Sequence, residues 1–185
     1  MKPLISACLF GVILLAGCAS PSGRLPDLPN EQSAAYLLGA GDTLRITVFG
    51  EADLSGTFKI SDNGALVMPL VGQVSAQGLS VPELQKRLTT QLNAKAVKSP
   101  DVTIQIEEYR PFFILGEVKN PGSYPYVPDM TVLTAVAIAG GFTFRASVDE
   151  VSVTRRRNGT ASESRASRAS RILPGDVVYV FERHF

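Results

Sequence analysis

Cysteine and histidine are scarce in this sequence. The chain has two cysteines, Cys8 and Cys18, and a single histidine, His184. These numbers exclude a zinc site built from clustered cysteine and histidine ligands, and they leave no cysteine pair for a disulfide once the first 17 residues are removed. The sequence also has no excess of one charge, with 18 basic and 17 acidic side chains. A general binder of polyanions would be more basic, so nucleic acid is not an expected partner.

Only one long apolar run is present, and it lies at the amino terminus. The stretch from Leu4 to Ala16 is uncharged and mostly apolar, which suits a signal-peptide core but is shorter than the roughly 20 residues that span a bilayer. Small residues then stand directly before Cys18, as in the lipobox of bacterial lipoproteins. We therefore expect a signal peptide at residues 1–17 and acyl chains on Cys18 that anchor the protein to a membrane. The alternative is an ordinary signal peptide that contains a cysteine by chance.

The residues after Cys18 predict a location and a tether. Alanine at position 19 differs from the aspartate of an inner-membrane retention signal, which favours an outer-membrane anchor with the protein facing the periplasm. Three prolines follow, with serine, glycine and asparagine between them, a composition typical of an extended linker. We expect residues 18–35 to be a lipidated tether that leads to the first folded domain.

Residues 36–108 have the pattern of one domain that mixes strands with a helix. Apolar and polar residues alternate over 44–49 and again over 102–107, as in strands with one buried face. Asn63-Gly64 lies between two further strand-like segments and predicts a hairpin that joins them. A helix follows, because Ser80 and Glu83 have the spacing of a capping box and leucines recur behind them at helical spacing.

Residues 109–182 predict a second domain, and together the two give an α+β fold class. Tyr109-Arg110-Pro111 marks the boundary between them. The expected elements are a strand over 112–118, a turn at Lys119-Asn120-Pro121-Gly122, a helix over 130–139 capped by Asp129, and strands over 148–153 and 176–181.

One short pattern occurs in both domains. Gly41-Asp42 and Gly175-Asp176 each follow an apolar residue and precede a strand-like segment. Both are predicted turns in which the aspartate accepts hydrogen bonds from nearby backbone N–H groups. The repeat suggests that the two domains enter a strand in the same way.

The sequence lacks a catalytic constellation. A glycan hydrolase needs two carboxylates held about 5–10 Å apart, whereas Asp42, Asp62 and Asp176 each lie in a glycine-containing turn, where a structural role is the simpler interpretation. Gly39 and Gly41 lack the rest of a dinucleotide fingerprint. We therefore predict no catalytic residue, no metal site and no cofactor.

The order of several segments resembles a known family. Residues 36–50, from Tyr36-Leu37-Leu38-Gly39-Ala40-Gly41-Asp42 onward, resemble the opening of the polysaccharide export domain of Wza-type outer-membrane proteins. Residues 116–124, with 139–142 and 173–180, resemble a soluble-ligand-binding β-grasp (SLBB) domain. With the lipobox, the resemblance covers nearly the whole chain.

This resemblance implies a function in transport. Members of the family carry secreted polysaccharide through the periplasm and outer membrane, form homo-oligomeric rings, and receive an inner-membrane polysaccharide copolymerase. Larger relatives have additional β-grasp domains and a terminal amphipathic helix that builds the outer-membrane pore. This sequence stops at His184-Phe185, so it resembles the short form, which implies a separate outer-membrane channel protein as a further partner.

Arginines gather in one stretch of the second domain. One interpretation is a solvated loop or ragged hairpin. The other is that a ring of subunits stacks these arginines into a positive collar, which holds an acidic polysaccharide through charge and forked hydrogen bonds. The candidate residues are Arg155, Arg156, Arg157, Arg165, Arg168 and Arg171.

The sequence leaves three candidate functions. The leading one is a lipid-anchored, ring-forming, non-enzymatic exporter of polysaccharide. The alternative is a monomeric periplasmic glycan-binding or scaffold lipoprotein, and a third is an envelope glycan hydrolase. The oligomeric state separates the first two, because an exporter of this kind closes into a ring.

Overall fold

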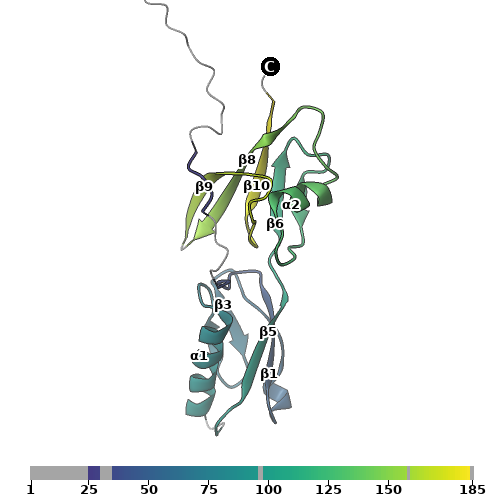
Figure 1. Ribbon diagram of the computed structural model, residues 1–185. Coiled ribbons are helices and arrows are strands. Elements are labelled where there is room, and N and C mark those ends of the chain that lie inside the picture. The colour runs from purple at the N-terminus through teal and green to yellow at the C-terminus, as the bar shows by residue number, and fades with distance from the viewer. Residues whose placement is uncertain (1–24, 30–34, 96–97, 158, 184–185) are drawn as a thin grey trace, which may run out of the picture.

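The computed structural model describes residues 25–29, 35–95, 98–157 and 159–183. Cys18 and the expected signal peptide lie outside the described residues. The structure has two units, one beyond the other along the molecule (Figure 1). The elements are, in order, β1 (Thr43–Val48), η2 (Ala52–Leu54), β2 (Gly56–Lys59), β3 (Ala65–Met68), β4 (Gly72–Ser75), α1 (Val81–Ala94), β5 (Val102–Glu108), β6 (Phe112–Gly116), β7 (Gly122–Tyr124), α2 (Val132–Ile138), β8 (Ala146–Arg157), β9 (Thr160–Ala166) and β10 (Val177–Glu182).

The first unit is built on a three-stranded antiparallel sheet in the order β2-β1-β5. The alternation in β1 buries Leu44, Ile46 and Val48 and exposes the residues between them. Ile46 lies opposite Ile104 of β5, so both strands turn the same apolar side toward the core. The sequence prediction of these two half-buried strands is confirmed.

Helix α1 packs its leucines into this core. Leu84, Leu88 and Leu92 are completely buried. The capping box also forms, because the Ser80 backbone N–H donates to Glu83 Oε2 at 2.8 Å and the Ser80 hydroxyl donates to the same oxygen at 2.7 Å. These two hydrogen bonds lower the pKa of Glu83 below its ordinary value, as expected for a carboxylate that accepts hydrogen bonds.

The predicted hairpin across Asn63-Gly64 is wrong. The turn exists, with the Gly64 N–H donating to the Ser61 carbonyl at 2.8 Å, but β2 pairs with β1 and β3 pairs with β4. A tight turn centred on Leu70 joins β3 to β4 instead, with a φ of 66° at that residue. Asn63-Gly64 therefore predicted the turn correctly but not the pairing, because the strands on its two sides belong to different sheets.

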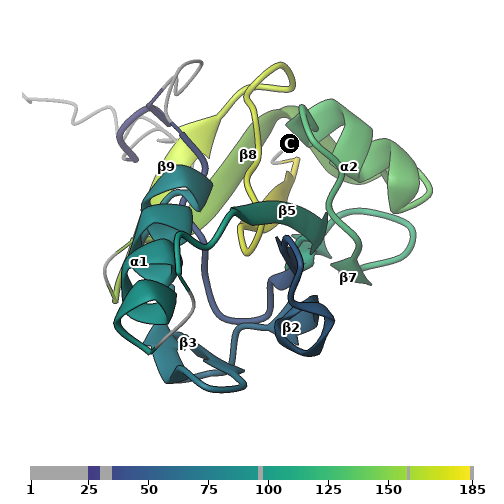
Figure 2. The same cartoon turned by 90° about the horizontal axis from the view of Figure 1, so that it is seen from below.

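The second unit is a five-stranded sheet in the order β7-β6-β10-β8-β9, with α2 against one face. Its central pair, β6 and β10, is parallel, and the other neighbours are antiparallel. Seen from below, α1 and α2 lie toward different sides of the molecule (Figure 2). Each unit therefore has its own helix and its own buried cluster of apolar side chains.

Two further predictions need correction. Thr131, not Asp129, caps α2, since the Thr134 N–H donates to Thr131 Oγ1 at 3.3 Å. Part of the expected tether is also bound: the Leu28 N–H donates to the Arg165 carbonyl at 2.7 Å, and the Arg165 N–H donates to the Pro26 carbonyl at 2.7 Å. These bonds satisfy backbone groups on β9, which is an edge strand.

The core of the first unit yields a direct test. Leu88→Ala removes a fully buried side chain, and we expect it to lower the free energy of unfolding by about 2–5 kcal/mol. The matched control is Thr90→Ala on the exposed side of α1, for which little change is expected. Urea denaturation followed by circular dichroism measures both, and equal losses in the two variants would contradict the packing described for α1.

Candidate functional site

The two Gly-Asp turns have the same geometry. Asp42 Oδ2 accepts the Gly39 N–H at 2.8 Å, and the Asp42 N–H donates back to the Gly39 carbonyl at 3.2 Å. Asp176 Oδ2 accepts the Leu173 N–H at 2.7 Å, and its own N–H donates to the Leu173 carbonyl at 3.1 Å. The sequence repeat is thus a structural repeat, with each aspartate closing the turn that leads into β1 or β10.

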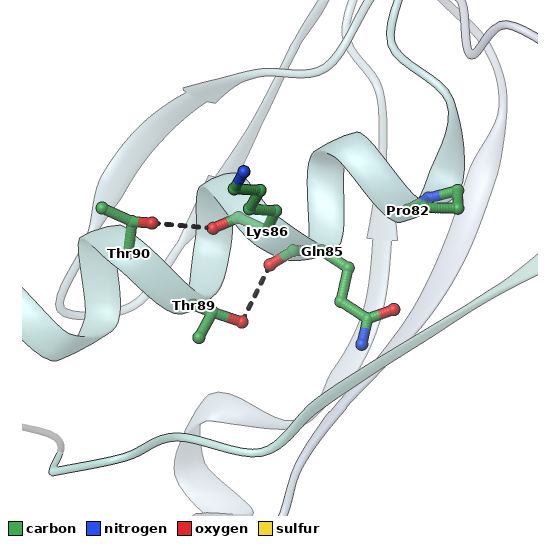
Figure 3. Close-up of a pocket in the computed structure, with 5 residues that line it drawn as sticks. All are labelled: Pro82, Gln85, Lys86, Thr89 and Thr90. Carbon is green, nitrogen blue, oxygen red and sulfur yellow. Dashed lines mark hydrogen bonds between the residues drawn. The ribbon is translucent and has the colours of Figure 1, made fainter.

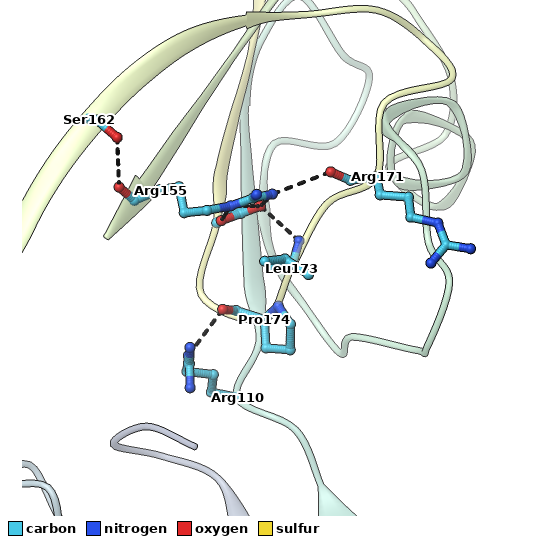
Figure 4. Close-up of polar contacts among 7 residues, drawn as sticks. Arg110, Arg155, Ser162, Arg171, Leu173 and Pro174 are labelled. Carbon is cyan, nitrogen blue, oxygen red and sulfur yellow. Dashed lines mark hydrogen bonds and ion pairs between the residues drawn. The ribbon is translucent and has the colours of Figure 1, made fainter. Parts of the chain in front are cut away.

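Arg110 connects both turns. Its backbone N–H donates to Asp42 Oδ1 at 2.9 Å, and its Nη1 lies 3.1 Å from Asp42 Oδ2 and 2.9 Å from the Tyr36 hydroxyl. On the other side, Arg110 Nε donates to the Pro174 carbonyl at 3.0 Å (Figure 4). We call these contacts the Arg110 junction, because one side chain bonds to the Gly-Asp turn before β1 and to the Gly-Asp turn before β10.

Arg110 passes close to the backbone at two glycines. A Cβ atom on Gly39 would lie 2.2 Å from Arg110 Nη1, and one on Gly175 would lie 2.7 Å from Arg110 Nε. Gly175 also has a φ of 85°, a conformation that residues with a Cβ rarely adopt. The close approach brings the Gly175 N–H to the Pro111 carbonyl at 3.0 Å, which adds a backbone bond between the second turn and the linker.

Both oxygens of the Asp42 carboxylate accept hydrogen bonds. It is completely buried, and the Tyr36 hydroxyl donates to Oδ2 at 2.7 Å in addition to the bonds above. Burial, and then the hydrogen bond to Asp42, raise the pKa of Tyr36, so this phenol stays protonated and remains a donor. The ring of Tyr36 continues into an edge-on ladder with Tyr109 and Tyr126, at centroid distances of 5.2 and 5.4 Å.

Asp176 is occupied in the same way by Arg155. Arg155 Nη2 lies 2.7 Å from Asp176 Oδ2, and Nε lies 3.0 Å from Oδ1. Arg155 is only 7% exposed, since it follows Val151 and Val153 on the inner side of β8. The prediction that Arg155 faces a polysaccharide is therefore wrong; its guanidinium neutralises a buried carboxylate and also donates to the Arg171 carbonyl (Figure 4).

The other predicted arginines are exposed, and several have carboxylate partners. They lie on or near a regular β8–β9 hairpin rather than in a ragged loop. Each ion pair joins the stretch to another part of the sequence, so the positive charge is partly compensated. The pairs are Arg165 with Asp27 at 2.7 Å, Arg168 with Asp149 at 3.6 Å and Arg171 with Asp129 at 3.0 Å, and Arg156 and Arg157 lie at the hairpin end.

The turn at Lys119-Asn120-Pro121-Gly122 packs against the end of α2. The Lys119 N–H donates to the Gly141 carbonyl at 3.0 Å, and the Asn120 N–H donates to the Ala139 carbonyl at 2.9 Å. The Tyr124 hydroxyl donates to the Asn120 carbonyl at 2.6 Å. The structure thus uses these residues to fasten the turn to the helix.

One hollow of the described surface is lined by Asp129, Arg155 and Arg171 among other residues. Another lies on α1 and is lined by Pro82, Gln85, Lys86, Thr89 and Thr90; the two threonine hydroxyls donate to helix carbonyls of Gln85 and Lys86 at 2.9 Å (Figure 3). Within the described ranges, no cluster of three or more histidine, cysteine, aspartate and glutamate side chains is placed to hold a metal ion. In the same part of the chain, neither helix is long and apolar enough to cross a membrane.

Comparison with known families decides what kind of protein carries these features. Residues 30–107 match the family described as polysaccharide biosynthesis/export protein, and residues 111–164 match the SLBB domain. The chain belongs to the polysaccharide export family. The predicted α+β fold class, with an export domain followed by an SLBB domain, is confirmed, and Arg110 itself lies between the two matched segments.

Curated relatives agree with this assignment. The exopolysaccharide production protein ExoF of Rhizobium meliloti (strain 1021) is 30% identical over 147 residues, which is 73% of this chain and 34% of ExoF. The polysialic acid transport protein KpsD of Escherichia coli is 25% identical over 141 residues, 75% of this chain and 25% of KpsD. The EPS I polysaccharide export outer membrane protein EpsA of Ralstonia solanacearum is 29% identical over 137 residues, 60% of this chain and 36% of EpsA. The chain therefore spans only about a quarter to a third of the length of these relatives.

Arg110 is the residue that sequence reasoning missed. It stood in a segment interpreted only as a boundary, and its partners Asp42 and Pro174 lie 68 and 64 residues away in the chain. The sequence did contain a hint of this contact. Arg110 lies between two units that each contain a Gly-Asp turn, so an aspartate of either turn was a possible partner for its guanidinium. The pattern alone did not say which aspartate it contacts.

We expect Arg110→Ala to destabilise the protein strongly. The change leaves the buried Asp42 carboxylate without its cation, a loss of about 3 kcal/mol. Arg45→Ala is the control, because Arg45 forms an exposed ion pair with Glu107 and such pairs contribute little. Denaturant unfolding of both variants is the measurement, and similar stabilities would argue against the Arg110 junction.

A comparison of two glycine variants tests whether Arg110 passes close to the backbone at Gly175. Gly175 and Gly159 have nearly equal positive φ values of 85° and 83°, but an added Cβ meets Arg110 only at Gly175. Both alanine variants carry the strain of the left-handed conformation, about 1–2 kcal/mol. We expect a lower melting temperature for Gly175→Ala than for Gly159→Ala, and the reverse order would be inconsistent with the geometry at Arg110.

Proposed function

We propose that this protein is a non-enzymatic component of a machine that exports polysaccharide across the bacterial envelope. The observation that carries the proposal is the consecutive match of an export domain and an SLBB domain. The printed names of ExoF, KpsD and EpsA all concern production, transport or export of polysaccharides, which supports the same role here. The saturated carboxylates of Asp42 and Asp176 fit a transport component better than a hydrolase.

The proposed arrangement follows from the sequence patterns and the relatives. Residues 1–17 are a signal peptide, and Cys18 carries the lipid that anchors residues 18–35 to the outer membrane. The export domain at 36–108 and the SLBB domain at 109–182 face the periplasm. The name of EpsA as an outer membrane export protein supports this location.

The proposed partners are the polysaccharide itself, further copies of the chain in a ring, an inner-membrane polysaccharide copolymerase and a separate outer-membrane channel protein. Within the ring, the exposed arginines of the SLBB domain line the path of an acidic polymer through charge and forked hydrogen bonds. Arg155 is no longer part of this set, because it is buried against Asp176. The proposed contact residues are Arg156, Arg157, Arg165, Arg168 and Arg171.

The decisive experiment compares secreted with retained polysaccharide in the native host. A deletion strain is complemented with the wild-type chain, with Cys18→Ser, or with Cys8→Ser as a matched control inside the expected signal peptide. We expect deletion to abolish secretion, Cys8→Ser to restore it, and Cys18→Ser to restore it only in part or not at all, because an unanchored protein leaves the membrane.

Two results would contradict the proposal. Unchanged secretion in the deletion strain would favour the alternative, a monomeric glycan-binding scaffold. Full secretion with Cys18→Ser would remove the lipid anchor from the mechanism while leaving the export role in place.

A further inference from the structure

Over strands β6 and β10, the side of the SLBB sheet that faces away from α2 carries large apolar side chains that are partly exposed. Strand β6 buries Phe112 and Ile114 toward α2 and turns Phe113 and Leu115 the other way, where they are 42% and 45% exposed. Alternation in a strand normally leaves polar residues on the solvent side. Here both sides of the strand are apolar.

The neighbouring strand extends the same surface. Val177 and Tyr179 of β10 lie beside Phe113 and Leu115 in the parallel register, and Phe181 packs edge-on against Tyr179 at 4.9 Å. We call these five residues the sheet strip. Three members of the sheet strip, Phe113, Leu115 and Tyr179, are each more than 40% exposed, and neighbouring exposed apolar side chains of this kind are typical of an interaction surface.

The export domain supplies an internal comparison. The outward side of its sheet carries exposed polar groups, including Arg45 paired with Glu107, and Thr57 donating to Glu107 at 2.8 Å. Thr47 and Thr103 lie opposite each other on the same side. The solvent-facing side of the export-domain sheet is thus polar. The sheet strip of the SLBB domain differs, because its residues are apolar.

A second apolar surface lies on the opposite side of the same domain. Helix α2 has the sequence VLTAVAI, with no charged residue. It buries Val132, Ala135 and Val136 in the core and leaves Leu133 and Ile138 about half exposed. With Thr134 and Ala137, these two outward residues form what we call the helix strip. Apart from Thr134, the outward side of α2 is apolar like its buried side, and a helix with apolar residues on both sides is typical of one that packs on both.

We propose that the sheet strip of one copy receives the helix strip of the next copy. A head-to-tail interface joins two unlike surfaces of the same chain, as these two strips are, and it builds a ring when the rotation between successive copies closes. A two-fold dimer would cover only one of the two strips. The inference rests on the ring assembly in the proposed function and names the surfaces through which it closes.

Because the sequence has only Cys8 and Cys18, introduced thiols report the contact cleanly. The full chain, purified in detergent, is prepared as Leu115→Cys/Leu133→Cys, as each single variant, and as wild type, and is treated with a short bismaleimide. The matched control is Thr47→Cys/Leu133→Cys, in which the sheet-strip thiol moves to the polar face of the export domain. We expect a ladder of crosslinked multimers from Leu115→Cys/Leu133→Cys alone.

Other outcomes separate the possible failures. A dimer from Leu115→Cys alone would show a two-fold contact between sheet strips and overturn the head-to-tail arrangement. No crosslink in the double variant, when light scattering finds the wild type oligomeric, would overturn the proposed surfaces and leave the ring intact. A monomeric wild type would overturn the ring itself, and secretion in the host would then decide whether the export role survives.

Discussion

The structure depends on one arginine that holds two turns together. Asp42 is buried and would be costly to leave unpaired, and Arg110 supplies the compensating charge from the linker between the domains. The same guanidinium reaches the Pro174 carbonyl, directly before the Gly-Asp turn of the SLBB domain. The Arg110 side chain therefore bonds to the turn before the first strand of the export domain and to the turn before the last strand of the SLBB domain.

This arrangement explains why the two domains share a local motif. Each Gly-Asp turn uses its aspartate to close the turn, and each aspartate takes one arginine, Arg110 for Asp42 and Arg155 for Asp176. The carboxylates serve structure, and the surfaces left for function lie elsewhere. Those surfaces are the exposed arginines and the two strips of the SLBB domain, which we propose recognise a polymer and neighbouring copies.

Local patterns predicted local structure well. The alternation in β1, the capping box at Ser80 and the Gly-Asp turns depend on residues close together in the chain, and all three are present. The hairpin at Asn63-Gly64 failed because turn chemistry does not determine which strands pair. The predicted cap of α2 at Asp129 was wrong, because the helix begins later and the Thr131 hydroxyl accepts the Thr134 N–H.

Contacts between residues far apart in the chain were not predicted from the sequence. Arg155 belonged to an arginine-rich stretch that looked solvated, and only the alternation along β8 shows that it points inward toward Asp176. Arg110 was missed for the same reason, since its partners are distant in the chain. The apolar side of β6 and β10 was visible as continuous hydrophobic runs, but which neighbours flank them comes from the sheet order.

The relative orientation of the two domains in solution tests the central claim most directly. Residual dipolar couplings of backbone amides in the export and SLBB domains give an alignment tensor for each. The Arg110 junction predicts that one tensor fits both domains in the wild-type chain. Two distinct tensors would show that the domains move independently and would contradict the account.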